Sequence, residues 1–207
     1  MKTIFYDWGG LNVWLFHLIN NVRGSLIDPF MQFGTDLGEH TNFPLYIAAA
    51  AIAGLTLSAR VSGRNAIEAE AVLRAWMVTL AVFACANVVD GLLIGWLKDW
   101  LDFPRPPSVL PPELLHVLGV PKYNHSLPSG HSAFAMTVAA SLWPMLNRPA
   151  RIGLAGYVLW VGLSRVSLGM HFPADVIAGY TLALIIVLIL RFILDRYRHP
   201  AGRNANV

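Results

Sequence analysis

Residues 75–97 read AWMVTLAVFACANVVDGLLIGWL, an apolar run in which Asp90 is the one charged residue. A helix of roughly 17–25 mostly apolar residues is long enough to cross the hydrocarbon core of a bilayer. Four further stretches of the chain have the same character, and they lie at 42–59, 131–147, 151–168 and 174–194. The pattern predicts an all-α integral membrane bundle with about five (five to six) transmembrane helices.

The overall composition agrees with a membrane protein. Apolar residues make up 56% of the 207 residues and charged residues only 13%, whereas soluble domains carry about 25% charged residues. The formal net charge is only +3 and no basic cluster stands out, so nucleic acid is not an expected partner. The single cysteine, Cys85, excludes an internal disulfide.

The segment before residue 42 is too broken for a regular span. Polar residues such as Asn12 and Asn20 interrupt the apolar stretch 11–19, and a second short segment follows at 29–37. We interpret residues 1–41 as N-terminal interfacial helices, with a tilted sixth span as the alternative. Residues 42–195 then form the transmembrane bundle, and residues 196–207 form a cytoplasmic tail.

The loop charges predict the orientation of the bundle. If the first span runs inward, one face carries Arg60, Arg64, Arg74, Arg148, Arg151, Arg191, Arg196, Arg198 and Arg203. The opposite face carries Lys98, Arg105, Lys122 and Arg165. Basic residues concentrate on the cytoplasmic side of membrane proteins. The first face is therefore expected in the cytoplasm and the second on the periplasmic or extracellular side.

Three short motifs fall on this second, outer face. They read Lys98-x6-Arg105-Pro106, Pro128-Ser129-Gly130-His131 and Ser164-Arg165-x5-His171-x3-Asp175. Each motif lies at the end of a predicted span, so alternating spans bring all three to one membrane boundary. Together they supply cations, histidines, a serine and a carboxylate, which are the groups needed to hold a phosphoryl group and displace an ester oxygen.

The cations and the second motif are suited to bind phosphate. Arg105 can make two parallel hydrogen bonds to phosphate oxygens, and Lys98 supplies a point charge. Ser129 is a plausible N-cap, and Gly130 lets the backbone approach a ligand closely. The free N–H groups of the helix that follows would then face the phosphate.

The two histidines are suited to the chemical steps. His171 stands four residues before Asp175, and Pro173 between them fits the first position of a helix. Asp175 can then accept a hydrogen bond from one ring nitrogen and direct the other at phosphorus. His131, from another helix, is left to protonate the leaving oxygen.

The three motifs resemble the signatures of the type 2 phosphatidic acid phosphatase family, and all signature positions are filled over roughly residues 75–195. The resemblance implies a helical bundle and a metal-independent phosphatase that needs no cofactor. It implies a phosphohistidine on His171, with His131 as the acid and Asp175 as its orienting group. It also implies that the phosphate is bound by Lys98, Arg105, Ser129, Gly130 and Arg165.

The short N-terminal part is similar to undecaprenyl-diphosphate phosphatases of the bacitracin-resistance type. Undecaprenyl diphosphate is therefore the preferred substrate, in a bacterial inner membrane. Phosphatidylglycerophosphate, phosphatidic acid and lipid A are alternative substrates within the family.

Other readings of the same residues remain open. Phosphoryl transfer to a second lipid would use the same pocket, and an anion or lipid transporter would use the cations without chemistry. A metal site is disfavoured because the histidine spacing matches no standard zinc pattern and nearby cations repel a metal ion. Asp90, an acid inside a span, is expected to support the site rather than to perform catalysis.

Overall fold

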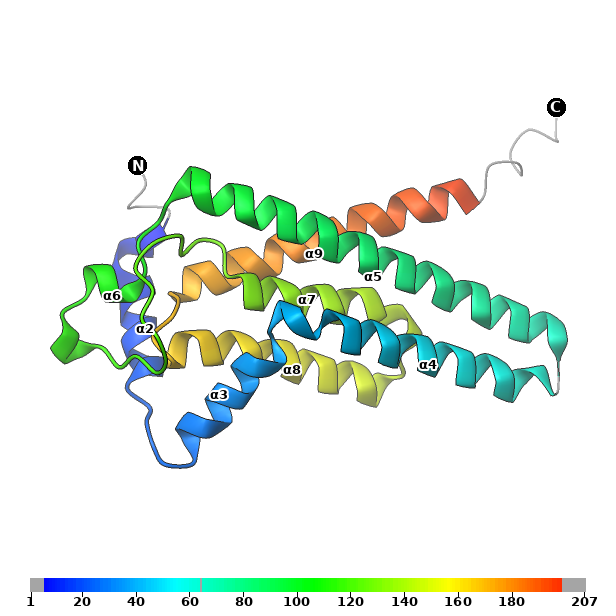
Figure 1. The fold of residues 1–207 in the computed structure, drawn as a ribbon, viewed down its shortest axis with the longest axis horizontal. Coiled ribbons are helices and arrows are strands. Elements are labelled where there is room, and N and C mark those ends of the chain that lie inside the picture. The colour runs from blue at the N-terminus through cyan, green and yellow to red at the C-terminus, as the bar shows by residue number, and fades with distance from the viewer. Residues whose placement is uncertain (1–5, 64, 199–207) are drawn as a thin grey trace.

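The computed structural model describes residues 6–63 and 65–198, and its main helices run side by side along the long axis (Figure 1). These helices are α4 (Phe43–Ser62), α5 (Ala66–Leu101), α7 (Gly130–Leu142), α8 (Arg148–Ser167) and α9 (Pro173–Arg198). No strand occurs in the described part of the chain. The predicted all-helical bundle is therefore confirmed, with a helix at each of the five predicted stretches.

The ends of α5 and α7 differ from the predicted stretches for identifiable reasons. Helix α5 begins at Ala66 rather than at residue 75, because the Asn65 side chain caps it by accepting hydrogen bonds from the backbone N–H groups of Ile67 and Glu68. Helix α7 ends at Leu142, and Pro144 lies in the short 3-10 turn that follows. Proline lacks the N–H that a continuing α-helix needs.

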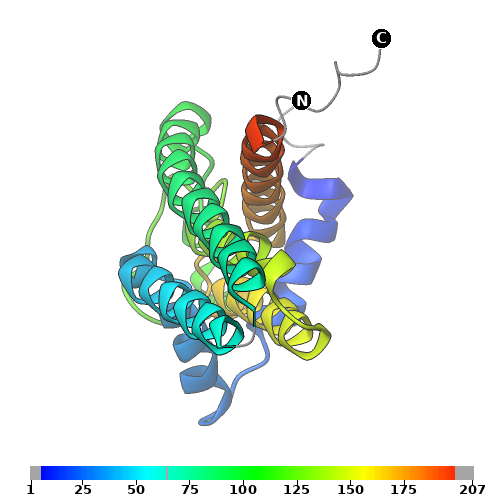
Figure 2. The same cartoon turned by 90° about the vertical axis from the view of Figure 1, so that its right-hand side faces the viewer.

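The spanning capacity of the helices is uneven. Within residues 6–63 and 65–198, three helical stretches are long and apolar enough to cross a membrane: His40–Ser62, Ala66–Val109 and Pro173–Arg196. Helix α7 has 13 residues, which at about 1.5 Å per residue falls short of a hydrocarbon core about 30 Å thick. It contacts α5, α8 and α9, which makes it the central helix of the bundle (Figure 2).

Glycines let the helices around the site approach closely. A Cβ atom on Gly179 of α9 would lie 2.5 Å from the backbone oxygen of Ser129, at the start of α7. A Cβ atom on Gly162 of α8 would lie 1.9 Å from the hydroxyl oxygen of Tyr180. Real Cβ atoms essentially never come within 3 Å of other heavy atoms, so a side chain at position 179 would collide with the α7 backbone and one at position 162 would displace the Tyr180 side chain.

The outward faces of the long helices are apolar. Large exposed hydrophobic side chains include Leu45, Ile52, Leu92, Leu188 and Ile189. A water-soluble protein rarely exposes a continuous apolar surface of this kind. These faces are the expected contact surface for lipid chains, in agreement with a multi-pass membrane protein.

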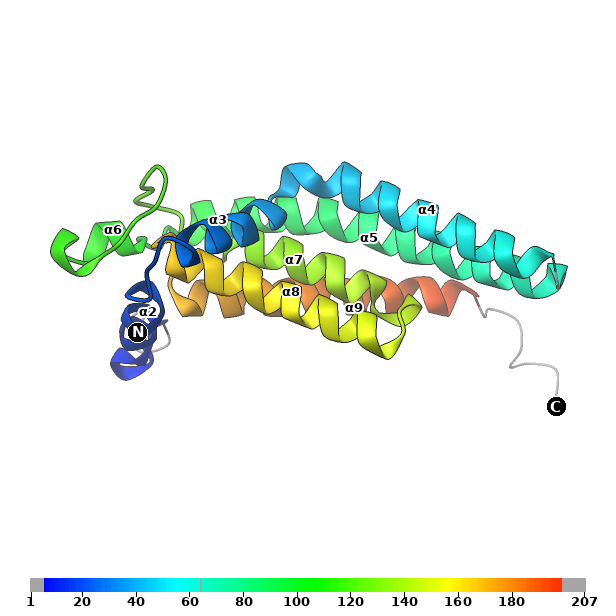
Figure 3. The same cartoon turned by 90° about the horizontal axis from the view of Figure 1, so that it is seen from below.

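The N-terminal helices are α2 (Leu11–Asn20) and α3 (Ile27–Leu37). Helix α2 lies across one end of the bundle, whereas α3 packs along α8 (Figures 1 and 3). A Cβ atom on Gly34 of α3 would lie 2.7 Å from Trp160 Nε1, so α3 is held directly on α8. The predicted interfacial position of these helices stays a prediction.

The charged residues divide between the two ends of the bundle. Arg60 lies in the last turn of α4 and Arg148 at the start of α8, at the end opposite α2 (Figure 1). Lys98 and Arg165 lie in the last turns of α5 and α8, at the end that carries α2. Arg64, Arg203 and the part of the predicted tail from residue 199 onward lie outside the described residues.

Candidate active site

The three motifs meet at the end of the bundle that carries α2. The last turn of α5, the first turn of α7 and the connection from α8 to α9 surround a polar cavity of about 280 Å³. Six of the eight predicted site residues line it, namely Lys98, Arg105, Gly130, His131, Arg165 and His171. The two histidines therefore face one space, as the motif spacing predicted.

His171 lies in the connection between α8 and α9 and is only 2% exposed. Its Nδ1 is 3.3 Å from Asp175 Oδ2, and its Nε2 is 3.2 Å from Arg105 Nη1. Because a guanidinium can only donate, Nε2 accepts, and the ring proton is on Nδ1. Burial and the nearby cations hold the pKa of His171 well below 6.5, which favours the neutral imidazole. In this structure the Nε2 lone pair is engaged by Arg105.

Asp175 is fully buried in the first turn of α9 and is enclosed by donors. Its Oδ1 accepts a hydrogen bond from the Tyr6 hydroxyl at 2.7 Å. Its Oδ2 accepts from Ser126 Oγ at 2.6 Å and from the backbone N–H of Phe172 at 2.8 Å. Burial and the Asp175 carboxylate raise the pKa of Tyr6, which keeps its hydroxyl protonated as a donor. The carboxylate is fixed in the orientation that His171 requires.

Arg105 holds the wall of the cavity together. Its Nε donates to the carbonyl oxygen of Asn124 at 2.9 Å, and its Nη2 donates to that of His125 at 3.2 Å. Its Nη1 donates to the carbonyl oxygen of Met170 at 3.0 Å, next to its contact with His171. Arg105 therefore ties the loop before α7 to the turn that carries His171, and also contributes positive charge to the cavity.

Arg165 is 7% exposed and its guanidinium is incompletely satisfied. Its Nη1 donates to Thr35 Oγ1 at 3.4 Å, while its buried Nε has no partner among the described residues. Lys98 lines the same cavity and makes no side-chain hydrogen bond or ion pair in the described structure. A buried cation without a full set of partners is costly. An anion in the cavity would supply the missing acceptors.

Ser129 is placed differently from the prediction. It is the N-cap of α7, but it is fully buried and does not line the cavity. Its Oγ accepts a hydrogen bond from Ser132 Oγ at 3.0 Å, and its backbone N–H donates to the carbonyl oxygen of Asp175 at 2.9 Å. Ser129 thus joins the start of α7 to the start of α9. Gly130, the next residue, does line the cavity and brings the positive end of the α7 dipole to it.

His131 also lines the cavity, and its contacts differ from those of His171. Its Nε2 is 2.8 Å from Glu39 Oε2, on the connection between α3 and α4. The side chain of His131 is 23% exposed, so this wall is more open than the wall formed by His171. The two histidines are thus each paired with a carboxylate, one buried and one partly exposed.

Asp90 does not contact the site cations. It lies 2% exposed between α5 and α7, where its Oδ2 accepts a hydrogen bond from Thr137 Oγ1 at 2.7 Å. This contact agrees with the expected supporting role. It joins the helix that carries Lys98 to the helix that carries His131.

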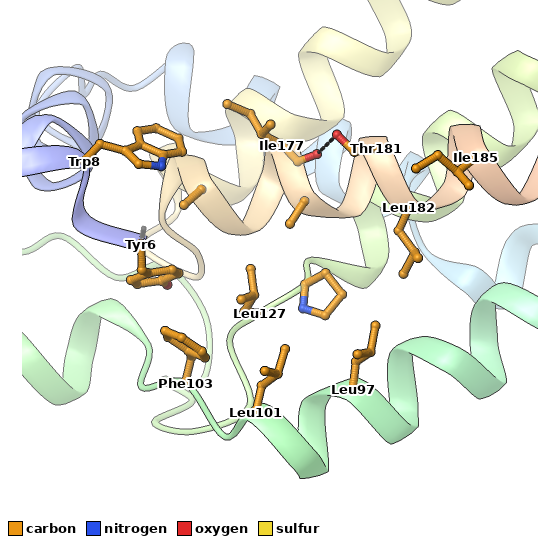
Figure 4. A pocket seen from close by; sticks show the side chains of 13 residues that line it. Tyr6, Trp8, Leu97, Leu101, Phe103, Leu127, Ile177, Thr181, Leu182 and Ile185 are labelled. Carbon is orange, nitrogen blue, oxygen red and sulfur yellow. Dashed lines mark hydrogen bonds between the residues drawn. The ribbon is translucent and has the colours of Figure 1, made fainter. Parts of the chain in front are cut away.

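An apolar groove lies beside the site, between α5 and α9 (Figure 4). Its volume is about 590 Å³, and Leu97, Leu101, Ile177, Leu182 and Ile185 are among its lining residues. Tyr6 and Phe103 close the groove at the end nearest α2. Leu97 and Ala174, which line the groove, each precede a predicted site residue directly in the sequence.

Several residues of the site were not identified from the sequence. Tyr6, Glu39 and His40 come from the N-terminal part of the chain, and Ser126 and Lys122 come from the loop before α7. Of these residues, only Ser126 lies close to one of the three motifs, three residues before Ser129. The N-terminal residues belong to no motif, and only the folding of α2 and α3 against the bundle brings them to the site.

Comparisons with known proteins agree with this arrangement. Residues 75–198 match the family model described as the PAP2 superfamily. The chain is 32% identical to phosphatidylglycerophosphatase B of Bacillus subtilis over 112 residues, which are 49% of this chain and 51% of that protein. It is also 32% identical to the undecaprenyl-diphosphatase BcrC of Bacillus subtilis over 114 residues, which are 54% of this chain and 56% of that protein. The matches thus span about half the length of these relatives.

A solved structure is similar over most of the fold. The crystal structure of Aquifex aeolicus LpxE superposes with a TM-score of 0.68 and 27% sequence identity, covering 88% of this chain and 95% of that one. The likeness extends beyond the matched family region, since 88% of this chain is more than residues 75–198 contain.

Proposed function

The chain belongs to the PAP2 superfamily, and from this membership we propose that it hydrolyses a phosphate from a membrane lipid through a phosphohistidine on His171. The observation that carries the proposal is the buried imidazole of His171, held between the Asp175 carboxylate and the Arg105 guanidinium. Nδ1 is held by Asp175, and Nε2 lies against Arg105, which also lines the polar cavity. A phosphoryl oxygen that took over the Arg105 hydrogen bond would leave Nε2 to attack phosphorus. This is the arrangement of an oriented nucleophile.

In the first chemical step, the Nε2 lone pair of His171 attacks phosphorus. The bond from phosphorus to the lipid oxygen breaks, and its electron pair goes to that oxygen, which takes a proton from His131. Lys98, Arg105 and Arg165 oppose the negative charge of the phosphoryl oxygens. Asp175 stabilises the positive charge that His171 acquires when its Nε2 becomes bonded to phosphorus.

In the second step, water cleaves the phosphohistidine. His131 removes a proton from the water, the water oxygen bonds to phosphorus, and the electron pair of the phosphorus–nitrogen bond returns to His171. The products are the dephosphorylated lipid and inorganic phosphate, and both histidines regain their initial state. Gly130 is proposed to contact the phosphate through the first turn of α7, because free N–H groups at a helix N-terminus bind anions. Ser129, whose N–H donates to Asp175, is proposed to hold that turn in place.

Undecaprenyl diphosphate is the substrate that we prefer, with a lipid monophosphate as the leaving group. The similarity to the undecaprenyl-diphosphatase BcrC supports this choice. The equal identity to phosphatidylglycerophosphatase B supports phosphatidylglycerophosphate as a second candidate. Phosphatidic acid and lipid A are the remaining candidates, and the apolar groove between α5 and α9 offers a surface for any of their chains.

The reaction is proposed to need no metal ion. The cavity is lined by the cations Lys98, Arg105, Lys122 and Arg165. Positive charge at this density repels a divalent cation and replaces the charge neutralisation that a metal would give to phosphate.

We place the site on the periplasmic side of a bacterial inner membrane. Arginines are in excess at the end of the bundle opposite the site, and basic residues favour the cytoplasmic side. The site would then face away from the cytoplasm. A lipid phosphate would then enter sideways from the outer leaflet.

The test is phosphate release by the purified protein from a panel of lipids in the presence of excess chelator. The panel contains undecaprenyl diphosphate, phosphatidylglycerophosphate, phosphatidic acid and lipid A. Release from at least one of them, unchanged by chelator, is the expected result. A loss of activity that a divalent ion restores would refute the metal-independent mechanism.

The same assay separates the alternative functions. A lipid phosphotransferase would move phosphate to a second lipid without releasing it into solution. A transporter of anions or lipids would leave every substrate chemically unchanged, which would refute the enzyme proposal altogether.

A further inference from the structure

Glu39 is the one carboxylate among the described residues that line the polar cavity. Its Oε2 lies 2.8 Å from Nε2 of His131, although the two residues are 92 positions apart in the sequence. Glu39 belongs to the connection between α3 and α4, which lies outside the region matched by the family model. No sequence motif assigns it a role.

The connection that carries Glu39 is held firmly in place. The carbonyl oxygen of Leu37 accepts hydrogen bonds from the hydroxyls of both Tyr46 and Tyr157, at 3.0 and 3.1 Å. A Cβ atom on Gly38 would lie 2.5 Å from an α8 side chain, so the backbone packs directly against that helix. Glu39 is therefore presented to His131 by a fixed backbone rather than by a loose surface loop.

A carboxylate at this place has electrostatic consequences for His131. The charged and titratable groups that share the cavity with His131 are His40, Lys98, Arg105, Lys122, Arg165 and His171. Burial of His131 and the cations among these groups both oppose its protonation. Glu39 supplies a compensating negative charge in direct contact with the ring.

We propose that Glu39 is a positioning residue that keeps a proton on Nε2 of His131, so that Nδ1 is the nitrogen that gives and takes the catalytic proton. An ionised carboxylate can only accept hydrogen bonds, which requires an N–H at Nε2. The inference rests on the proposed function, because it assigns the tautomer of the acid–base residue in that reaction.

The assignment satisfies both chemical steps. Before the first step, His131 carries protons on both nitrogens, and the Glu39 charge stabilises this imidazolium. The Nδ1 proton then goes to the lipid oxygen as the phosphorus–oxygen bond breaks. In the second step, the Nδ1 lone pair takes a proton from water, which restores the imidazolium. Throughout the cycle the Nε2 proton stays on His131.

Glu39→Gln tests the proposal, because an amide carries no charge and can either accept from Nε2 or donate to it, so it no longer requires a proton on that nitrogen. Two substrates that carry the same short lipid chain are compared. In one the leaving oxygen is bonded to an alkyl carbon, and in the other it is bonded to an aromatic ring. The aryl oxygen leaves without needing a proton, so only the alkyl phosphate depends on an acid in the first step. General acid–base groups contribute about 10²- to 10⁴-fold to rates.

We expect the variant to lose kcat/KM with the alkyl phosphate but mainly kcat with the aryl phosphate. For the alkyl phosphate, kcat/KM of the variant falls by about tenfold or more. For the aryl phosphate, kcat/KM changes little while kcat falls, and a burst of aryl alcohol reveals accumulated phosphohistidine. Asp36→Asn is the matched control, because Asp36 belongs to the same region but is exposed and pairs with Gln32.

Two outcomes would overturn the inference while leaving the proposed function intact. One is unchanged kinetics of Glu39→Gln with both substrates. The other is an equal fall of kcat/KM for both substrates, which would indicate general damage to the site. If the wild-type protein releases phosphate from neither these substrates nor the lipid panel, the proposed function itself fails.

Discussion

The hydroxyl of Tyr6 donates a hydrogen bond of 2.7 Å to Oδ1 of Asp175, a residue 169 positions away in the sequence. Asp175 in turn lies 3.3 Å from Nδ1 of His171. Tyr6 precedes α2 and lies outside the region that the PAP2 family model matches. The part of the chain outside that region thus contributes a contact one step from the proposed nucleophile.

Tyr6→Phe removes this hydrogen bond while keeping the aromatic ring that packs near Phe103, with ring centroids 4.5 Å apart. A hydrogen bond to a charged group contributes about 1.5–3 kcal/mol. We expect kcat for phosphate release to fall about tenfold, with KM nearly unchanged, because Asp175 orients His171 less well. A melting temperature close to that of the wild type is the control. Unchanged kcat would show that Ser126 and Phe172 suffice to fix the carboxylate.

His171→Ala removes the proposed nucleophile. We expect phosphate release to fall to background, because no other imidazole among the described residues is held against Asp175. His116→Ala, in the loop before α7, serves as a control that removes a histidine without touching the cavity. Radiolabelled phosphate should be trapped on the wild-type protein and not on His171→Ala. Near-normal turnover by this variant would refute the assignment.

Arg165→Ala removes the buried guanidinium whose Nε lacks a partner in the described structure. Loss of one donor to a developing oxyanion costs about 10²- to 10³-fold in rate. We expect kcat/KM to fall in this range. Arg151→Ala is the matched control, because Arg151 lies at the other end of the same helix and donates to the carbonyl oxygen of Trp143. Similar losses in both variants would point to a general effect on α8.

The pH dependence of kcat/KM should report the lowered pKa of His171. Burial and the cations around it stabilise the neutral ring, so the reactive form persists as the pH falls below 6.5 and is lost only at the lower folded-state pKa. The acid limb should therefore have its midpoint below 6.5, after correction for titration of the substrate phosphate near about pH 6. A midpoint at or above 6.5 that belongs to the enzyme would contradict this assignment.

The apolar groove gives a prediction about lipid chains. Ala178 of α9 lines this groove, and Ala178→Trp would fill part of it. We expect KM to rise for a long-chain substrate and to stay unchanged for a short-chain analogue. Ala49→Trp, on the exposed face of α4, is the control for adding a tryptophan to the lipid-facing surface. An equal change with both chain lengths would separate the groove from substrate binding.

The helices were predictable because each of the five main stretches is mostly apolar, and this signal depends on no tertiary contact. The residues at which the helices begin and end were harder to predict. The start of α5 at Ala66 depends on the Asn65 cap and lies in a charged segment that hydropathy treats as loop. The short length of α7 could not be read from its apolar sequence, because Pro144 permits a 3-10 turn that continues the apolar run.

The site was predictable where the motifs lie at helix ends. Lys98, His131 and His171 reach one cavity because alternating helices bring their ends to the same face. The role of Ser129 in joining α7 to α9 was not predictable, since it depends on how closely these helices pack. Glu39 was not predictable either, because its contact arises from the packing of α3 on α8.

The two histidines differ in how firmly they are anchored. His171 is 2% exposed within a network of buried hydrogen bonds, whereas the side chain of His131 is 23% exposed and pairs with a Glu39 side chain that is 47% exposed. On gentle heating in detergent, we expect the neighbourhood of His131 to loosen before that of His171. Retention of a phosphate analogue such as vanadate and catalytic turnover would then disappear at two different temperatures, with turnover lost first.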